Sequence, residues 1–175
     1  MTTPWAFPST ITQYTEPGTD EIFVSWDDSD EFRQIKQQDG RALQSVGALE
    51  HIARSPKHDL KNKTYYLKAT NFNFQYIPDA ISGIELKIVA RRYGRVVDDT
   101  VQLLVNDVIS GENKATLEIK PEKIYGGEFD LWSIDSITKT DLESVEFGVV
   151  IRFKAHPDWP HKDPVLIDSV EMRIH

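Results

Sequence analysis

The strongest constraint on the fold is the alternation of apolar and polar residues along the second half of the chain. In residues 80–92, AISGIELKIVARR, four apolar side chains fall on one side of an extended chain: Ile84, Leu86, Ile88 and Ala90. The other side is polar, with Val89 the exception: Glu85, Lys87 and Arg91. Because successive side chains of a strand point to opposite faces of its sheet, this pattern predicts a strand with one face in a core.

Similar stretches recur, and turn-forming residues separate them. Strand patterns are found at 21–26, 64–74, 99–106, 114–120, 128–134, 145–155 and 166–175. Gly, Asn, Asp and Pro gather between them, as in YGR, NDVISGENK, YGG and HPDWPHKDP. Short alternating strands at such spacing predict an all-β fold, an antiparallel β-sandwich of a jelly-roll-like kind. Trp132 is expected in its core.

At most one or two short helices are expected beside the strands. Residues 41–55 carry apolar side chains near helical spacing, although Gly40 and Gly47 weaken a helix there. We predict a short helix over this stretch, and a strand that starts near Arg41 is the alternative. The segment TKTDLES predicts one helical turn, with Thr138 or Thr140 as its N-cap.

The chain is long enough for one sizeable core, at 175 residues. We predict a single β-sandwich domain over 21–175 and an extended N-terminal arm over 1–20, which is rich in Pro, Thr and Ser. Aromatic side chains on such an arm need a surface to dock on, which is either its own domain or a neighbouring subunit. The N-terminus lacks the basic and long apolar regions of a signal peptide, so none is expected.

Composition narrows the partners. The chain has no cysteine, so disulfides, thiol catalysis and cysteine-type zinc sites are excluded. Its formal net charge is −8 and its positive charges are scattered, which argues against specific nucleic-acid binding. No apolar run approaches the roughly 18 residues of a membrane-spanning helix, so no membrane partner is expected.

Catalytic signatures are missing from the sequence, which contains no G-x-S-x-G, no phosphate-binding Gly-rich loop and no H-E-x-x-H. Four side chains could in principle hold a metal ion in the HPDWPHKDP loop: His156, Asp158, His161 and Asp163. The acidic run 27–31 lacks the glycine and the distal glutamate of a calcium loop. Four carboxylates near strand ends could serve a hydrolase: Asp98, Asp99, Asp130 and Asp168. Turn formation explains all of these more simply, so we expect no enzyme, no cofactor and no metal site.

An ordered series of motifs is similar to a family of small β-sandwich proteins found among tailed-bacteriophage structural proteins. A Trp near an early strand is followed by a "DG" and a small residue, here Trp26 and Asp39-Gly40-Arg41-Ala42. The motifs that follow, in order, are YLKATNFNFQYIP, ISGIELKIVARR, DDTVQLL, GENKA, YGGEFDLWSI, FGVVIRF and IDSVEMRIH. The match covers about residues 22–175, with Asn73 and Ser133 standing where the family often has Gly.

This resemblance implies a virion component that is made in the host cytoplasm and acts by docking on other virion proteins. It could be a capsid decoration protein or a head, neck or tail accessory protein, present as a homo-oligomer or in multiple copies. Five aromatic residues are the candidate partner contacts: Trp5, Phe7, Tyr14, Trp26 and Trp159. A carbohydrate- or receptor-binding module is the alternative, because exposed aromatic side chains on such a sandwich can also stack on sugars.

Overall fold

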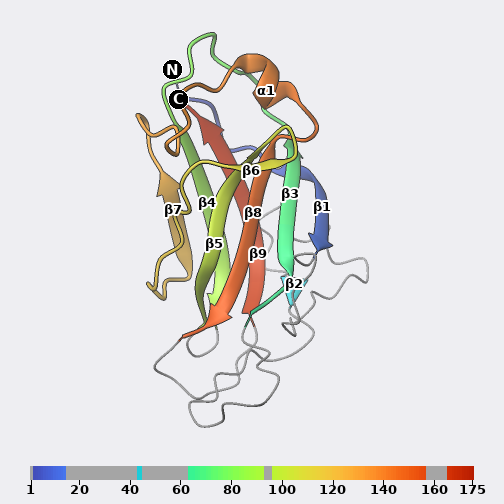
Figure 1. The fold of residues 1–175 in the computed structure, drawn as a ribbon, viewed down its shortest axis with the longest axis vertical. Helices are drawn as coiled ribbons and strands as arrows, with labels where there is room; N and C mark the ends of the chain where they lie inside the picture. The colour runs from blue at the N-terminus through green and yellow to red at the C-terminus, as the bar shows by residue number, and fades with distance from the viewer. Residues whose placement is uncertain (1, 15–42, 45–62, 93–95, 157–164) are drawn as a thin grey trace.

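The fold is an antiparallel β-sandwich, as the sequence predicts (Figure 1). A computed structural model describes residues 2–14, 43–44, 63–92, 96–156 and 165–175. The strands in these ranges are β1 (Pro8–Tyr14), β2 (Leu43–Gln44), β3 (Tyr66–Phe72), β4 (Ile84–Arg92), β5 (Val96–Val105), β6 (Val108–Ser110), β7 (Glu122–Gly126), β8 (Gly148–Ala155) and β9 (Val165–Ile174). One sheet has five strands in the order β1-β3-β8-β5-β6, and the other has four in the order β2-β9-β4-β7.

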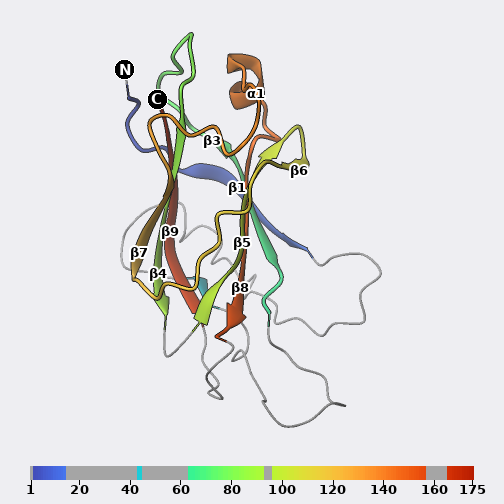
Figure 2. The same ribbon diagram turned by 60° about the vertical axis from the view of Figure 1, so that its left-hand side comes forward.

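The two sheets face each other across a single apolar core, as Figure 2 shows nearly edge-on. The alternation predicted for β4 is confirmed, since four of its side chains are fully buried: Ile84, Leu86, Ile88 and Ala90. The five-stranded sheet contributes the alternating residues of β8 and the residue before it, with Phe147, Val149, Ile151 and Phe153 also at 0% exposure. Side chains of this size stabilise a fold by about 1.5–3 kcal/mol each when buried, so the core dominates stability.

Apart from the β5–β6 hairpin, consecutive described strands alternate between the sheets, which gives the sandwich its jelly-roll-like character. The chain passes from β3 in the five-stranded sheet to β4 in the four-stranded sheet, and back to β5. Later, β8 inserts between β3 and β5, while β9 pairs with β4. The predicted final strand is therefore an interior strand that runs to the C-terminus.

The N-terminal segment joins the two sheets. Thr3 and Ala6 donate backbone hydrogen bonds to Ile174 and Met172 of β9, at 2.8 and 2.7 Å. After Phe7 the chain crosses to the other sheet, where β1 pairs antiparallel with β3. Residues 3–14 thus cover one side of the sandwich in the structure.

Two predicted strands are wrong. No strand forms at 114–120, where the chain crosses from the five-stranded to the four-stranded sheet (Figure 2). Asn113 fixes this crossing, because its side-chain oxygen accepts hydrogen bonds from the backbone N–H groups of Val101 and Ala115. None forms at 128–134 either, because Trp132 and Ser133 have φ of 58° and 60°, which breaks an extended chain. The strand of this region is β7, which lies between the two predictions.

The helix predictions had different outcomes. Helix α1 (Lys139–Glu143) confirms the predicted turn, with Thr138 as its N-cap and Asp141 completing a capping box. The predicted helix over 41–55 is wrong at Leu43 and Gln44, which form β2 and favour the alternative strand. The rest of that stretch, like the predicted strand at 21–26, lies outside the described residues. Within those residues, no helix is long and apolar enough to cross a bilayer.

Candidate partner-binding surfaces

Trp5 lies on the outer face of the four-stranded sheet, where its ring is held by two cations. The Lys87 ammonium is 4.9 Å from the ring centroid, and the Arg173 guanidinium is 4.4 Å from it. Such cation–π contacts contribute about 0.5–2 kcal/mol each. The indole is half-buried and therefore anchors the N-terminal segment on its own domain.

The cations around Trp5 belong to a paired network along β4 and β9. Lys87 Nζ lies 2.7 Å from Glu171 Oε2, and Glu171 also accepts a 2.9 Å hydrogen bond from Ser169. Arg173 and His175 both reach Glu85. Burial alone would raise the pKa of Glu85, but hydrogen bonds from Arg173 and His175 outweigh it and lower that pKa. The network neutralises its own charges, so it holds the N-terminal segment rather than forming an open charged site.

The other predicted contact residues differ in position. Phe7 is half-buried where the chain crosses between the sheets, and its carbonyl accepts a 3.1 Å hydrogen bond from the Asn73 N–H. Tyr14 lies on the outer face of the five-stranded sheet, stacked on Tyr66 with ring centroids 5.1 Å apart. Trp26 and Trp159 lie outside the described residues. Trp5, Phe7 and Tyr14 therefore do not form one patch.

A groove crosses the outer face of the five-stranded sheet. Its volume is about 420 Å³, and six of the described residues line it: Thr12, Tyr14, Lys68, Leu104, Asp107 and Ile109. Lys68 and Asp107 form an ion pair across it, from β3 to the β5–β6 turn. Tyr66 and Val150 form a second, smaller apolar cluster with Leu104 on this face. The groove thus offers apolar surface beside a paired cation and anion.

The free edge of the four-stranded sheet is the surface that sequence reasoning missed. β7 pairs with β4 on one side, and within the described residues no strand pairs with its other side. The Pro121 carbonyl accepts a hydrogen bond from Ala90 on β4. Because backbone groups alternate in direction along a strand, the N–H and C=O groups of Glu122 and Ile124 point away from β4.

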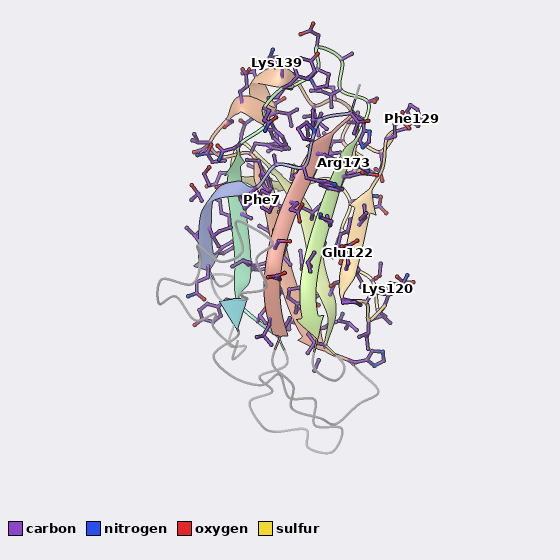
Figure 3. All side chains as sticks on the ribbon, turned by 180° about the vertical axis from the view of Figure 1, so that it is seen from behind. Phe7, Lys120, Glu122, Phe129, Lys139 and Arg173 are labelled. Atoms are coloured by element: carbon purple, nitrogen blue, oxygen red, sulfur yellow. The ribbon has the colours of Figure 1, made fainter. Side chains whose placement is uncertain are left out.

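Exposed apolar side chains accompany this edge. The Ile124 side chain is 51% exposed on β7 itself, and Phe129, just after β7, is 83% exposed (Figure 3). Leu117 and Ile119 are exposed in the segment that leads into β7. We call these four residues, together with the outward backbone groups of Glu122 and Ile124, the β7 edge surface.

The inward side of β7 is held tightly. Lys123 Nζ lies 2.6 Å from Asp98 Oδ2 and 2.8 Å from Thr116 Oγ1, and the Tyr125 hydroxyl donates to the same Asp98 oxygen at 2.8 Å. At the end of β7, Gly126 has φ of +80°, and a Cβ there would lie 2.1 Å from the Ile84 carbonyl oxygen. The β7 edge is therefore a defined surface rather than a loose segment.

The carboxylates considered for hydrolysis have other roles in the structure. Asp98 faces the core side and accepts a hydrogen bond from Lys123 Nζ. Asp99 faces outward, where Arg152 Nε donates to it at 2.6 Å. Asp130 Oδ2 pairs with Lys114 at 2.9 Å. Asp168 lies in β9 opposite the register shift between Val89 and Ala90. Among the described residues, no three His, Asp or Glu side chains are grouped to hold a metal ion.

Comparisons with known proteins add no relative, since no family model, no curated protein and no solved structure matches the chain. The resemblance to tailed-phage structural proteins therefore stays a prediction from the motifs. Within the fold, several of those motifs build the sandwich: the Trp132 indole N–H, for example, donates to the Ile84 carbonyl at 3.0 Å, beside Gly126.

Proposed function

We propose that this protein is a structural component of a tailed-phage virion that acts by docking on other virion proteins. The motif series over residues 22–175 supports the virion assignment. The observation that carries the docking role is the β7 edge surface, where a strand edge that no other described strand pairs with coincides with exposed apolar side chains. An edge strand of this kind is a template for another chain, and soluble proteins usually cover it.

The decisive experiment is co-sedimentation with phage particles that lack this protein. The wild-type protein should sediment with the particles and saturate at a copy number that matches a symmetry of the head, neck or tail. That number would also place the protein in the virion. Failure to sediment at any concentration would overturn the proposed function.

Two surface variants locate the contact. Phe129→Ser removes the most exposed apolar side chain of the β7 edge surface and should weaken particle binding about tenfold or more, the size of a hot-spot residue. Val145→Ser is the matched control, because Val145 is also an exposed apolar residue, at 66%, but follows α1 rather than flanking β7. Equal binding by both variants would move the contact away from β7.

The predicted N-terminal contacts are tested in the same assay. Trp5 is half-buried against its own domain, whereas particle binding would require it to face a partner. Replacing Trp5 by Leu keeps apolar bulk over the sheet but removes the aromatic ring. A loss of particle binding by Trp5→Leu, at a temperature at which the variant stays folded, would support the predicted arm contact, and unchanged binding would assign docking to other surfaces.

The alternative is a carbohydrate-binding module, which the groove on the five-stranded sheet favours. Neutral sugars present an apolar ring face and hydroxyl groups, and the groove offers Leu104 and Ile109 beside the Lys68–Asp107 pair. Titration with neutral oligosaccharides, followed by amide chemical shifts, tests this function. Saturable shifts at Lys68 and Leu104 that disappear in Asp107→Ala would support it, while no shift at millimolar sugar would reject it.

A further inference from the structure

The β7 edge surface also has the features needed to bind its own copy. An antiparallel strand pair can be arranged about a two-fold axis, so one exposed edge is a complete half of a symmetric contact. The outward backbone groups come from alternate residues, with Ile124 at the middle of β7. A two-fold axis through Ile124 would therefore join its N–H and C=O groups to those of Ile124 in the second copy.

About this axis, apolar side chains of the two copies would face one another. The Ile124 side chain projects from the outer face and is 51% exposed, so its counterpart would lie directly opposite it. The same axis brings the start of one β7 to the end of the other. The exposed Ile119, before β7, would then approach Phe129 of the second copy, and each would cover apolar surface that water now contacts.

Charges at the two ends also complement each other. Lys120 precedes β7 and Glu128 follows it, and both are exposed. Figure 3 places Lys120 and Phe129, the neighbour of Glu128, at opposite ends of β7. The two-fold arrangement therefore sets Lys120 of one copy near Glu128 of the other, twice. A parallel arrangement would instead bring the two Lys120 side chains together and the two Glu128 side chains together.

We propose that two copies of this chain pair edge to edge through β7, in antiparallel register about Ile124, to form a continuous sheet across the dimer. This inference rests on the proposed docking function and makes a second copy the occupant of the β7 edge, so that a β7 substitution weakens particle binding by breaking the dimer that docks. The contact is closed, because each copy uses its one β7 edge and leaves none for a third chain. The Asp98 contact with Lys123 and the fixed Gly126 keep the edge in shape for such pairing.

Cysteine cross-linking tests the register directly, because the chain has no cysteine of its own. Paired residues at a hydrogen-bonded position of antiparallel strands have Cα atoms about 5.5 Å apart, within the range that a disulfide spans. Under mild oxidation, Ile124→Cys should give a covalent dimer at least tenfold faster than the matched control Val145→Cys. Equal rates for the two variants would overturn the proposed pairing.

Light scattering supplies the second measurement, without oxidation. The wild-type protein should approach twice its monomer mass of 20.1 kDa as concentration rises. Lys120→Glu should weaken the dimer about threefold or more, and Lys120→Glu combined with Glu128→Lys should restore it. A monomer at every concentration, or a double variant no better than Lys120→Glu alone, would count against the pairing.

Particle binding separates this inference from the proposed function. If the wild-type protein sediments with particles but Ile124→Cys does not cross-link, the dimer is wrong and the docking function stands. If Ile124→Cys cross-links efficiently but the protein never binds particles, the dimer stands and the virion assignment is wrong. Ile124→Asp offers a check on both, because it should abolish the dimer while leaving the buried side of β7 intact.

Discussion

The two edges of the four-stranded sheet differ in whether another segment of the chain covers them. At one edge, the side of β9 that faces away from β4 is covered: the N–H of Ala6 donates to Met172 at 2.7 Å, and the N–H of Met172 donates back to Ala6 at 2.9 Å. β2 pairs with the other half of that edge, at Leu166 and Ile167. At the β7 edge, within the described residues, no strand occupies the corresponding positions.

The difference separates a surface closed by the fold from a surface left for a partner. Covering an edge is the usual way to prevent sheet-to-sheet association. The N-terminal segment does this at β9, with Trp5 held over the sheet by Arg173. On the outer side of β7, no described strand takes up the backbone groups and the Ile124 side chain is 51% exposed, while Lys123 anchors the inward side on Asp98. We therefore read the open edge as a binding surface.

The largest expected effect concerns how β7 is anchored. Gly126→Ala should destabilise the protein by about 3 kcal/mol or more, because the new Cβ would lie 2.1 Å from the Ile84 carbonyl oxygen at a residue with φ of +80°. Gly127→Ala is the control, since a Cβ there meets nothing within 4 Å. Urea unfolding measures both. Similar destabilisation by the two variants would mean that β7 is not fixed at Gly126.

A proline at each edge tests the comparison itself. Ala6→Pro removes a donor whose acceptor, the Met172 carbonyl, is inside the sheet, and should destabilise the protein by about 2 kcal/mol or more. Ile124→Pro removes an N–H that points away from β4, where proline is tolerated on an edge, and should cost about 1 kcal/mol. Thermal unfolding at low protein concentration compares them. A larger effect at Ile124 would contradict the assignment of β7 as the open edge.

Lowering the pH should weaken the Glu85–Arg173 pair, on the side of the sheet that the N-terminal segment covers. Glu85 has a lowered pKa in the folded protein, so its contribution to stability is present above its unfolded pKa and is lost as pH falls through the folded pKa. Glu85→Gln should therefore lower the free energy of unfolding by about 1 kcal/mol at pH 7 and by progressively less in acid. Arg173→Gln removes the same pair and should flatten the same part of the pH curve. A constant difference between wild type and Glu85→Gln at all pH values would exclude this pairing as the cause.

Long, regular alternation made most of the sandwich predictable from sequence. In β4, β8 and β9 the inward residues are apolar because they must fill the core between the sheets, and the pattern reports that directly. The helical turn α1 was predictable for a local reason, since the side chains of Thr138 and Asp141 satisfy each other's backbone N–H groups. These are cases in which local and long-range interactions favour the same structure.

The open edge could not be predicted because its pattern is inverted. On β7 the buried side chains are Lys123 and Tyr125, at 6% and 5% exposure, and the apolar Ile124 is exposed. The contact with Asp98, from a distant strand, satisfies polar atoms of both Lys123 and Tyr125, and Thr116 accepts a further hydrogen bond from Lys123, which makes this burial possible. β1 was missed for a related reason: Ile11 is the only branched apolar residue of PSTITQY, and β3 supplies the pairing.

The smallest effect is expected from the substitution that most sharpens the comparison. Ile124→Thr keeps a β-branched side chain at an exposed position, so at low protein concentration it should change the free energy of unfolding by less than about 0.5 kcal/mol. At high concentration the wild-type protein should gain stability, because only the folded chain forms the dimer. Each tenfold decrease in the dissociation constant of the dimer corresponds to about 1.4 kcal/mol. The variant should gain less, so the two unfolding midpoints should separate as concentration rises. Parallel concentration series for both proteins therefore measure what the open edge contributes, and coincident midpoints throughout would mean that β7 meets no second copy.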